Sequence, residues 1–79
     1  MAYYTDVSSA RNGAAVTPSD STTFAATRAL YVGVSGDVKV DMAGGATLTF
    51  KAAPVGMLPI QAVRVYSTGT TATDIVALR

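Results

Sequence analysis

The sequence predicts a small all-β domain, an antiparallel β-sandwich or barrel of five to seven short strands with an extended N-terminal arm. Three observations predict it. Thr occurs eleven times and Val ten times among 79 residues, and β-branched side chains pack well on pleated sheets. Apolar and polar residues alternate from Leu30 onward, and Gly or Pro interrupts the alternation at short intervals. The fourteen Ala residues are dispersed and form no helical stripe.

The middle of the chain contains the most regular alternation. Apolar residues at alternate positions of 30–34 indicate a strand, and Ser35-Gly36 indicates a turn into a second strand over 38–42. These two strands are predicted to form a hairpin. Ala43-Gly44-Gly45 predicts a second turn into a strand over 47–51, because paired glycines adopt positive φ without steric cost. A three-stranded meander is therefore expected between Leu30 and Phe50.

The C-terminal part continues with shorter elements. Pro54-Val55-Gly56 interrupts the sheet, since Pro cannot donate to a strand ladder. Residues 60–66 form an apolar segment whose alternation changes phase, which indicates a bulge or a strand that is buried on both faces. A turn is expected at Thr68–Thr71 and a terminal strand at Asp74–Arg79.

The first 29 residues differ in composition from the rest. They are rich in Ser, Thr, Asn, Gly and Pro, and their apolar periodicity is weak, which is typical of an arm-like segment. An extended piece at 16–20 fits an edge strand, where Pro18 is tolerated. We divide the chain into an N-terminal arm, residues 1–13, and a single β-domain, residues 14–79. Tyr3 and Tyr4 are expected to order against a neighbouring subunit.

The composition argues for assembly with other proteins. A domain of 79 residues usually needs a disulfide, a structural metal or oligomerisation, and this chain has no Cys and no His. Its acids are five dispersed Asp residues, so we expect no metal and no cofactor. Hydrophobic residues make up 49% and charged residues 14%, which suggests that a partner covers part of the surface.

Other classes of partner are disfavoured by charge and hydropathy patterns. The net charge is +1, and the four Arg and two Lys residues are scattered, whereas binding to a phosphate backbone needs a basic stripe. We expect no nucleic-acid partner. No apolar run of about 18 residues and no signal-peptide pattern are present, so the chain is expected to be soluble, unprocessed and not membrane-bound.

Catalytic patterns are weak. Without His, nucleophilic catalysis would need a Ser-Lys pair or an exposed N-terminal Thr, and nothing in the sequence supports either. Asp37 and Asp41 would share a strand face, but Asp37 fits a turn and Asp41 a solvated face. Lys39 and Lys51 are also expected on solvated faces. We predict that the protein is not an enzyme.

Arg and Tyr residues beside apolar sequence are the candidate interface residues. Arginine is enriched in interfaces because its planar fork pairs bidentately while its stem packs; the alternative, a snorkelling side chain at the rim of a sheet, remains open for Arg28 and Arg64. Tyr31 and Tyr66 are expected in the core or in an interface rather than in a stacking platform for nucleic acid. The candidate interface set is Tyr3, Tyr4, Arg28, Tyr31, Arg64, Tyr66 and Arg79.

Several short motifs follow one another from residue 16 to the end of the sequence. They are Val16–Asp20, Ala26–Gly33, Gly36–Val38, Met42–Gly45, Phe50, Pro54–Gly56, Leu58–Ile60, Val63–Val65, Thr68–Thr73 and Ile75–Leu78. In this order the motifs resemble the head-spike base proteins of gene transfer agents and related tailed phages. The resemblance spans about residues 14–79, and the first dozen residues depart from it.

The resemblance implies a virion structural protein on the outer face of the capsid, at its vertices, where it anchors a spike or fibre. The implied partners are further copies of the chain, with a pentamer favoured over a trimer, the major capsid protein, and a spike or fibre protein. Two alternatives remain: a trimeric capsid cement or decoration protein, and a small β-barrel module that binds glycan or single-stranded nucleic acid.

Overall fold

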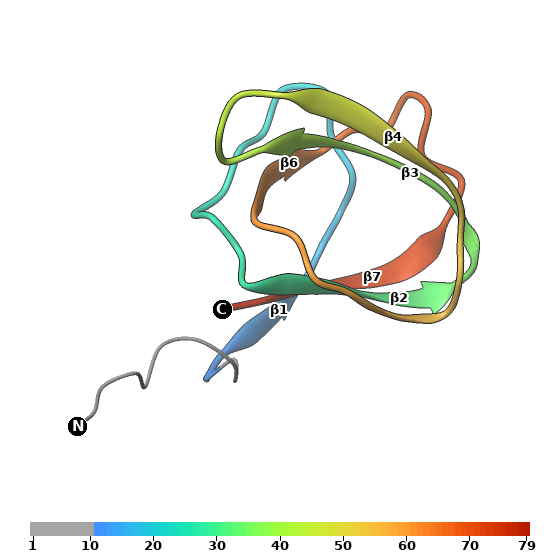
Figure 1. The fold of residues 1–79 in the computed structure, drawn as a ribbon, viewed down its shortest axis with the longest axis horizontal. Coiled ribbons are helices and arrows are strands. Elements are labelled where there is room, and N and C mark those ends of the chain that lie inside the picture. The colour runs from blue at the N-terminus through green and yellow to red at the C-terminus, as the bar shows by residue number, and fades with distance from the viewer. Residues whose placement is uncertain (1–10) are drawn as a thin grey trace.

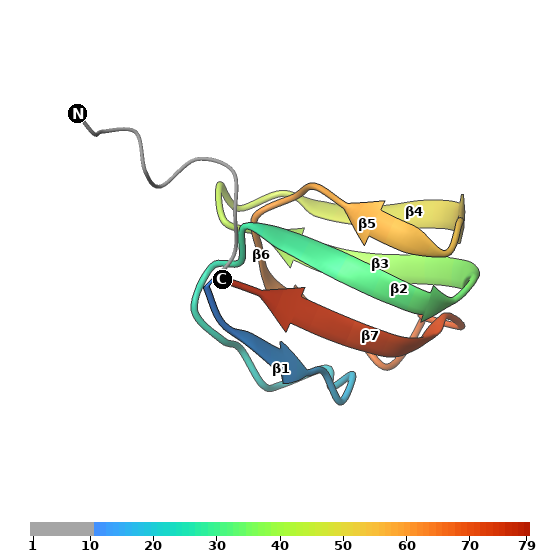
Figure 2. The same cartoon turned by 90° about the horizontal axis from the view of Figure 1, so that it is seen from below.

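Two antiparallel sheets lie face to face in the structure, a computed structural model that describes residues 11–79 (Figure 1). Sheet A has the strand order β1-β7-β2-β5 and sheet B the order β4-β3-β6; Figure 2 looks onto sheet A, with sheet B behind it. The all-β prediction is confirmed, and the arrangement is a sandwich. The strands are β1 (Gly13–Ala15), β2 (Ala29–Val34), β3 (Gly36–Met42), β4 (Thr47–Ala53), β5 (Gly56–Leu58), β6 (Ala62–Val65) and β7 (Thr73–Leu78).

The predicted hairpin between β2 and β3 is wrong, and with it the meander from Leu30 to Phe50. β2 pairs with β5 and β7 in sheet A, whereas β3 pairs with β4 and β6 in sheet B. Ser35 alone links the two strands, so the chain crosses from one sheet to the other instead of folding back beside itself. Alternation was misleading here because two strands that face each other across a core have the same pattern as two strands that are paired.

The second predicted turn is confirmed. β3 and β4 pair antiparallel around Ala43–Gly45, and the N–H of Gly45 donates to the carbonyl of Met42 at 2.9 Å. Gly45 has φ +107°, a conformation that glycine adopts without a Cβ clash.

The change of phase in the apolar alternation of residues 60–66 comes from a β-bulge, one of the two explanations that the sequence allowed. On β3 the neighbours Asp41 and Met42 pair with Arg64 and Ala62 of β6, so the intervening Val63 has no register partner. This extra residue turns both Ala62 and Val65 into the core.

The segment 16–28 closes one side of the sandwich. After β1 pairs with β7, the chain runs along the free edge of β6, where Ser19, Phe24 and Thr27 donate backbone hydrogen bonds to Val65, Val63 and Ala62. The edge strand lies at Gly13–Ala15, just before the stretch 16–20 that the sequence indicated. Pro18 explains the shift, because it lacks the N–H that a longer strand would need.

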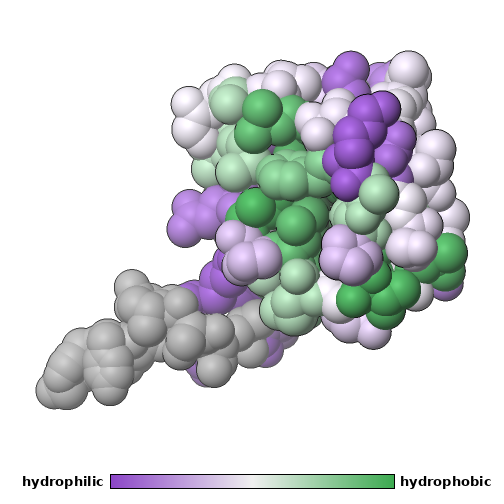
Figure 3. Space-filling model, turned by 45° about the vertical axis from the view of Figure 1, so that its right-hand side comes forward, coloured by the Kyte–Doolittle hydropathy of each residue, from purple (hydrophilic) through white to green (hydrophobic). Residues whose placement is uncertain are grey.

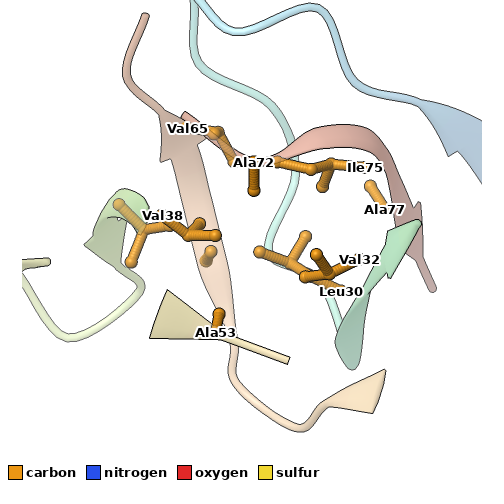
Figure 4. Close-up of a cluster of buried hydrophobic side chains, with 10 residues drawn as sticks. Leu30, Val32, Val38, Ala53, Val65, Ala72, Ile75 and Ala77 are labelled. Carbon is orange, nitrogen blue, oxygen red and sulfur yellow. The ribbon is translucent and has the colours of Figure 1, made fainter. Parts of the chain in front are cut away.

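The core fills the space between the sheets. Alternate residues of β2, β3, β6 and β7 point toward one another in Figure 4. Thr27 is the one buried polar residue among those described; its hydroxyl donates to the Ile60 carbonyl at 2.9 Å and accepts from the Ala62 N–H at 3.1 Å. The fully buried large side chains besides Thr27 are Leu30, Val32, Val38, Val40, Val65 and Ile75.

Truncating Leu30 tests this core. Leu30 is fully buried, whereas Leu48 on β4 is 47% exposed. We expect Leu30→Ala to lower the free energy of unfolding by about 2–5 kcal/mol, because it leaves a cavity, and Leu48→Ala to cost clearly less. Urea denaturation followed by circular dichroism measures both. Equal losses for the two variants would contradict the burial described here.

Candidate assembly surfaces

The outer face of sheet A carries a row of apolar side chains that crosses all four strands. Backbone register places Ala15 opposite Val76, Val76 opposite Tyr31, and Tyr31 opposite Met57. We call these four residues the apolar row. Tyr31 is 39% exposed and Met57 59% exposed, and Val55 at the end of the neighbouring turn is 57% exposed. Figure 3 shows hydrophobic surface in the middle of the face that it presents, and a smaller hydrophobic area at its lower right, near the level at which sheet A lies in Figure 1.

An exposed row of this composition is typical of a contact surface. Aromatic residues and Met are enriched at the cores of protein interfaces, where charged residues are depleted, and the apolar row has no charged member. Met adapts its flexible side chain to the opposing surface. The apolar row is therefore a candidate docking face.

The outer face of sheet B is polar, and its side chains bind one another. The Tyr66 hydroxyl lies 3.0 Å from both carboxylate oxygens of Asp41. Arg64 donates to that hydroxyl at 3.3 Å and forms an ion pair with Asp41 at 3.5 Å, while the Thr47 hydroxyl donates to the same carboxylate. The Lys39 ammonium lies 4.8 Å from the centre of the Tyr66 ring, in cation–π contact. These five residues, the Asp41 cluster, hold a fixed polar surface.

Hydrogen bonding lowers the pKa of Asp41 and of Asp37 and so favours their ionised forms. The Thr47 hydroxyl, and then Tyr66 and the positive charges of Arg64 and Lys39, hold the pKa of Asp41 below its ordinary value. The pKa of Asp37 is lowered chiefly by the Ala52 N–H, which donates to it at 2.9 Å. Neither carboxylate is poised as a proton donor near neutral pH, so the pair is unsuited to shared acid–base chemistry.

Asp20 fastens the segment 16–28 to the loop between β6 and β7. Its carboxylate accepts hydrogen bonds from the backbone N–H groups and the hydroxyls of Ser67 and Thr68, at 2.7–3.2 Å. The N–H and hydroxyl of Thr68 are the main reasons that the pKa of Asp20 is lowered. These hydrogen bonds therefore stabilise the ionised carboxylate of Asp20 and attach segment 16–28 to the β6–β7 loop.

The candidate interface residues from the sequence fall in different places. Tyr31 lies in the apolar row, Arg64 and Tyr66 lie in the Asp41 cluster, and Arg28 and Arg79 together line an open hollow at one end of the sandwich. Tyr3 and Tyr4 lie outside the described residues.

Sequence reasoning did not identify Met57 and Val55. A signal was present, because two large apolar residues stand in a segment bounded by Pro54 and Pro59, which is too short to form a buried strand of its own.

Residues 11–79 include no group of three or more Asp, Glu, His or Cys residues placed to hold a metal ion. Within the same range, no helix is long and apolar enough to cross a membrane.

The described residues form a small β-sandwich with the apolar row on one outer face and the hydrogen-bonded Asp41 cluster on the other. Neither the protein-family models nor the curated proteins give a match to the chain. Among solved structures, it matches a chain in the capsid of a native gene transfer agent (GTA) particle, computed with C5 symmetry. The TM-score is 0.80, with 38% sequence identity over 91% of this chain and 86% of that chain.

At this identity and coverage the chain belongs to the same family as that chain of the GTA capsid structure. The family is one of capsid-associated structural proteins.

Stability should fall in acid because the pKa values of Asp20, Asp37 and Asp41 are lowered in the folded state. The contribution of these three carboxylates to the free energy of unfolding is complete above the ordinary aspartate pKa of about 3.9. It is lost as the pH falls through their lower pKa values in the folded state. Urea midpoints measured between pH 7 and pH 2.5 should show this loss.

The variant Asp20→Asn should be less stable at pH 7 and should lose less on acidification than the parent chain. Thr49→Asn is the control, since it changes an exposed polar residue of β4 and leaves every carboxylate in place. If Asp20→Asn and Thr49→Asn had the same pH profile, the bonds to Ser67 and Thr68 would not contribute as described.

Proposed function

We propose that this chain is a virion structural protein that sits on the outer face of the capsid, at its vertices, as a head-spike base that anchors a spike or fibre. The observation that carries the proposal is the match at 38% identity and TM-score 0.80 to a chain of the GTA capsid. The function is structural and involves no catalysis. This agrees with carboxylates that are already occupied by hydrogen bonds.

The proposed assembly is a ring of five copies. The matched chain comes from a capsid computed with C5 symmetry, and a vertex offers five equivalent positions. A closed ring gives each copy two different contact surfaces, which adds burial that the core of a 79-residue chain lacks.

The apolar row is the proposed contact with the major capsid protein. It is broad, spans the full width of sheet A, and lacks charge, as the centre of a lasting protein contact requires. The Asp41 cluster, which includes Arg64 and Tyr66, lies on the opposite face and is the proposed contact with the spike or fibre protein. Tyr3 and Tyr4, in the proposed arm of residues 1–13, are proposed to contact a neighbouring subunit.

A charged residue in the apolar row should block docking. We expect Met57→Asp to weaken binding to capsids that lack this protein by about tenfold or more, because the carboxylate would be buried without a partner. Thr49→Asp is the matched control, since Thr49 is exposed on β4 opposite Lys39. Co-sedimentation with the capsids measures binding, and melting curves verify that both variants fold.

Three results would contradict parts of this proposal. Equal binding by Met57→Asp and the parent chain would exclude the apolar row as the capsid contact. Binding sites spread across the shell in trimers would indicate a cement protein. Retention on a glycan array, or salt-dependent binding of oligonucleotides with no affinity for capsids, would indicate a binding module.

A further inference from the structure

The two ends of the sandwich differ in charge. Arg28 precedes β2 and Arg79 follows β7, and the Arg28 N–H donates to the Leu78 carbonyl at 2.7 Å, so the two arginines lie at the same end. Arg11 lies there too, because its N–H donates to the Arg79 carbonyl. Asp74 lies near the start of β7, about 17 Å away along the strand at 3.3 Å per residue. Figure 2 shows these ends, with the C-terminus at the left.

The arginine end contains a hollow without a carboxylate side chain. Arg28 and Arg79 line it together with Ala26, Thr27 and Gln61, and its volume is about 380 Å³. The Arg79 guanidinium stacks over the Phe24 ring at 5.9 Å, which restricts its orientation, and its Nε is buried with no hydrogen-bond partner in the described part of the chain. Arg28 and Arg79 both line the hollow, and an anion bound between two positively charged side chains offsets their repulsion. The hollow is therefore suited to an oxyanion.

The other aspartates of residues 11–79 are already bound. Asp20, Asp37 and Asp41 accept hydrogen bonds or ion pairs from their own chain. The Asp74 side chain is exposed and accepts no hydrogen bond within the described residues. Among the aspartates of residues 11–79, it is the one whose side chain has no partner within that range.

The backbone presents Asp74 in an unusual conformation. Its φ is +56°, in the left-handed region that Asp tolerates better than most residues. Gly33 makes the room for it, since a Cβ at position 33 would lie 2.7 Å from the Asp74 Cβ. Two residues on neighbouring strands thus accommodate a strained acid at the end of the sheet opposite the arginines.

We propose that the Asp74 carboxylate of one copy enters the hollow between Arg28 and Arg79 of the next copy, so that the chains join head to tail. The contact rests on the ring proposed above. A guanidinium fork pairs bidentately with a carboxylate, and a head-to-tail contact uses two different surfaces, as ring closure requires. A nucleic-acid backbone fits the hollow less well, because Lys51 and Lys39 are engaged with Asp37 and Tyr66 and extend no basic stripe from it.

Charge variants test the contact. Sedimentation velocity across a concentration series measures self-association of the full chain. Asp74→Asn removes the charge and keeps a residue that tolerates positive φ; we expect it and Asp74→Arg to weaken association about tenfold or more. The matched control is Thr49→Arg, which adds a positive charge on the outer face of sheet B. Combining Asp74→Arg with Arg28→Asp and Arg79→Asp exchanges the charges of both surfaces and should restore association.

The outcomes distinguish this contact from the proposed function. Association of both Asp74 variants equal to that of Thr49→Arg would overturn the head-to-tail pairing while leaving the ring and the capsid role intact. A parent chain that stays monomeric at every concentration would overturn the ring, and the contact with it. Loss of association for the arginine variants alone, with Asp74 variants unaffected, would also overturn the pairing, because the hollow would then bind some other anion.

Discussion

The crossing from β2 to β3 constrains the rest of the structure. Ser35 alone carries the chain from sheet A to sheet B, and Gly36 passes so close to Ala72 that a Cβ at position 36 would lie 2.5 Å from the Ala72 nitrogen. With so short a link, the apolar sides of β2 and β3 must face each other across the core. β7 and β5 then flank β2, and β6 and β4 flank β3. In each strand, the side chains that alternate with the core residues point outward from the sandwich.

The outward positions of the two sheets have opposite character. On sheet A they bring Tyr31 beside Met57 and leave apolar area in solvent. On sheet B they bring Asp41 beside Arg64, and Tyr66 completes a hydrogen-bonded cluster. Most polar groups of the Asp41 cluster bind one another, whereas leaving the apolar row exposed forgoes hydrophobic stabilisation. This difference is the physical basis for assigning the capsid contact to sheet A.

Alternation in the sequence was sufficient to predict the longer strands and the turn at Ala43–Gly45, and it left a bulge or a doubly buried strand as the two interpretations of residues 60–66, because these are local features. The partner of β2 could not be predicted, since facing and paired strands bury the same residues. Arg64 and Tyr66 were candidates for an interface because they stand in apolar sequence; the structure adds that they bind Asp41, which lies 23 residues before Arg64 and reaches it only through strand pairing. The hollow between Arg28 and Arg79 likewise depends on the β2–β7 pairing.

An electron cryomicroscopy reconstruction of the intact particle tests the central claim most directly, because it shows both the number of copies and the face that meets the shell. The account predicts five copies around each vertex, with Tyr31 and Met57 of sheet A against the major capsid protein and Tyr66 of sheet B facing away from the shell. Copies distributed over the shell away from the vertices, or a sheet A whose outer face lies in solvent, would contradict it.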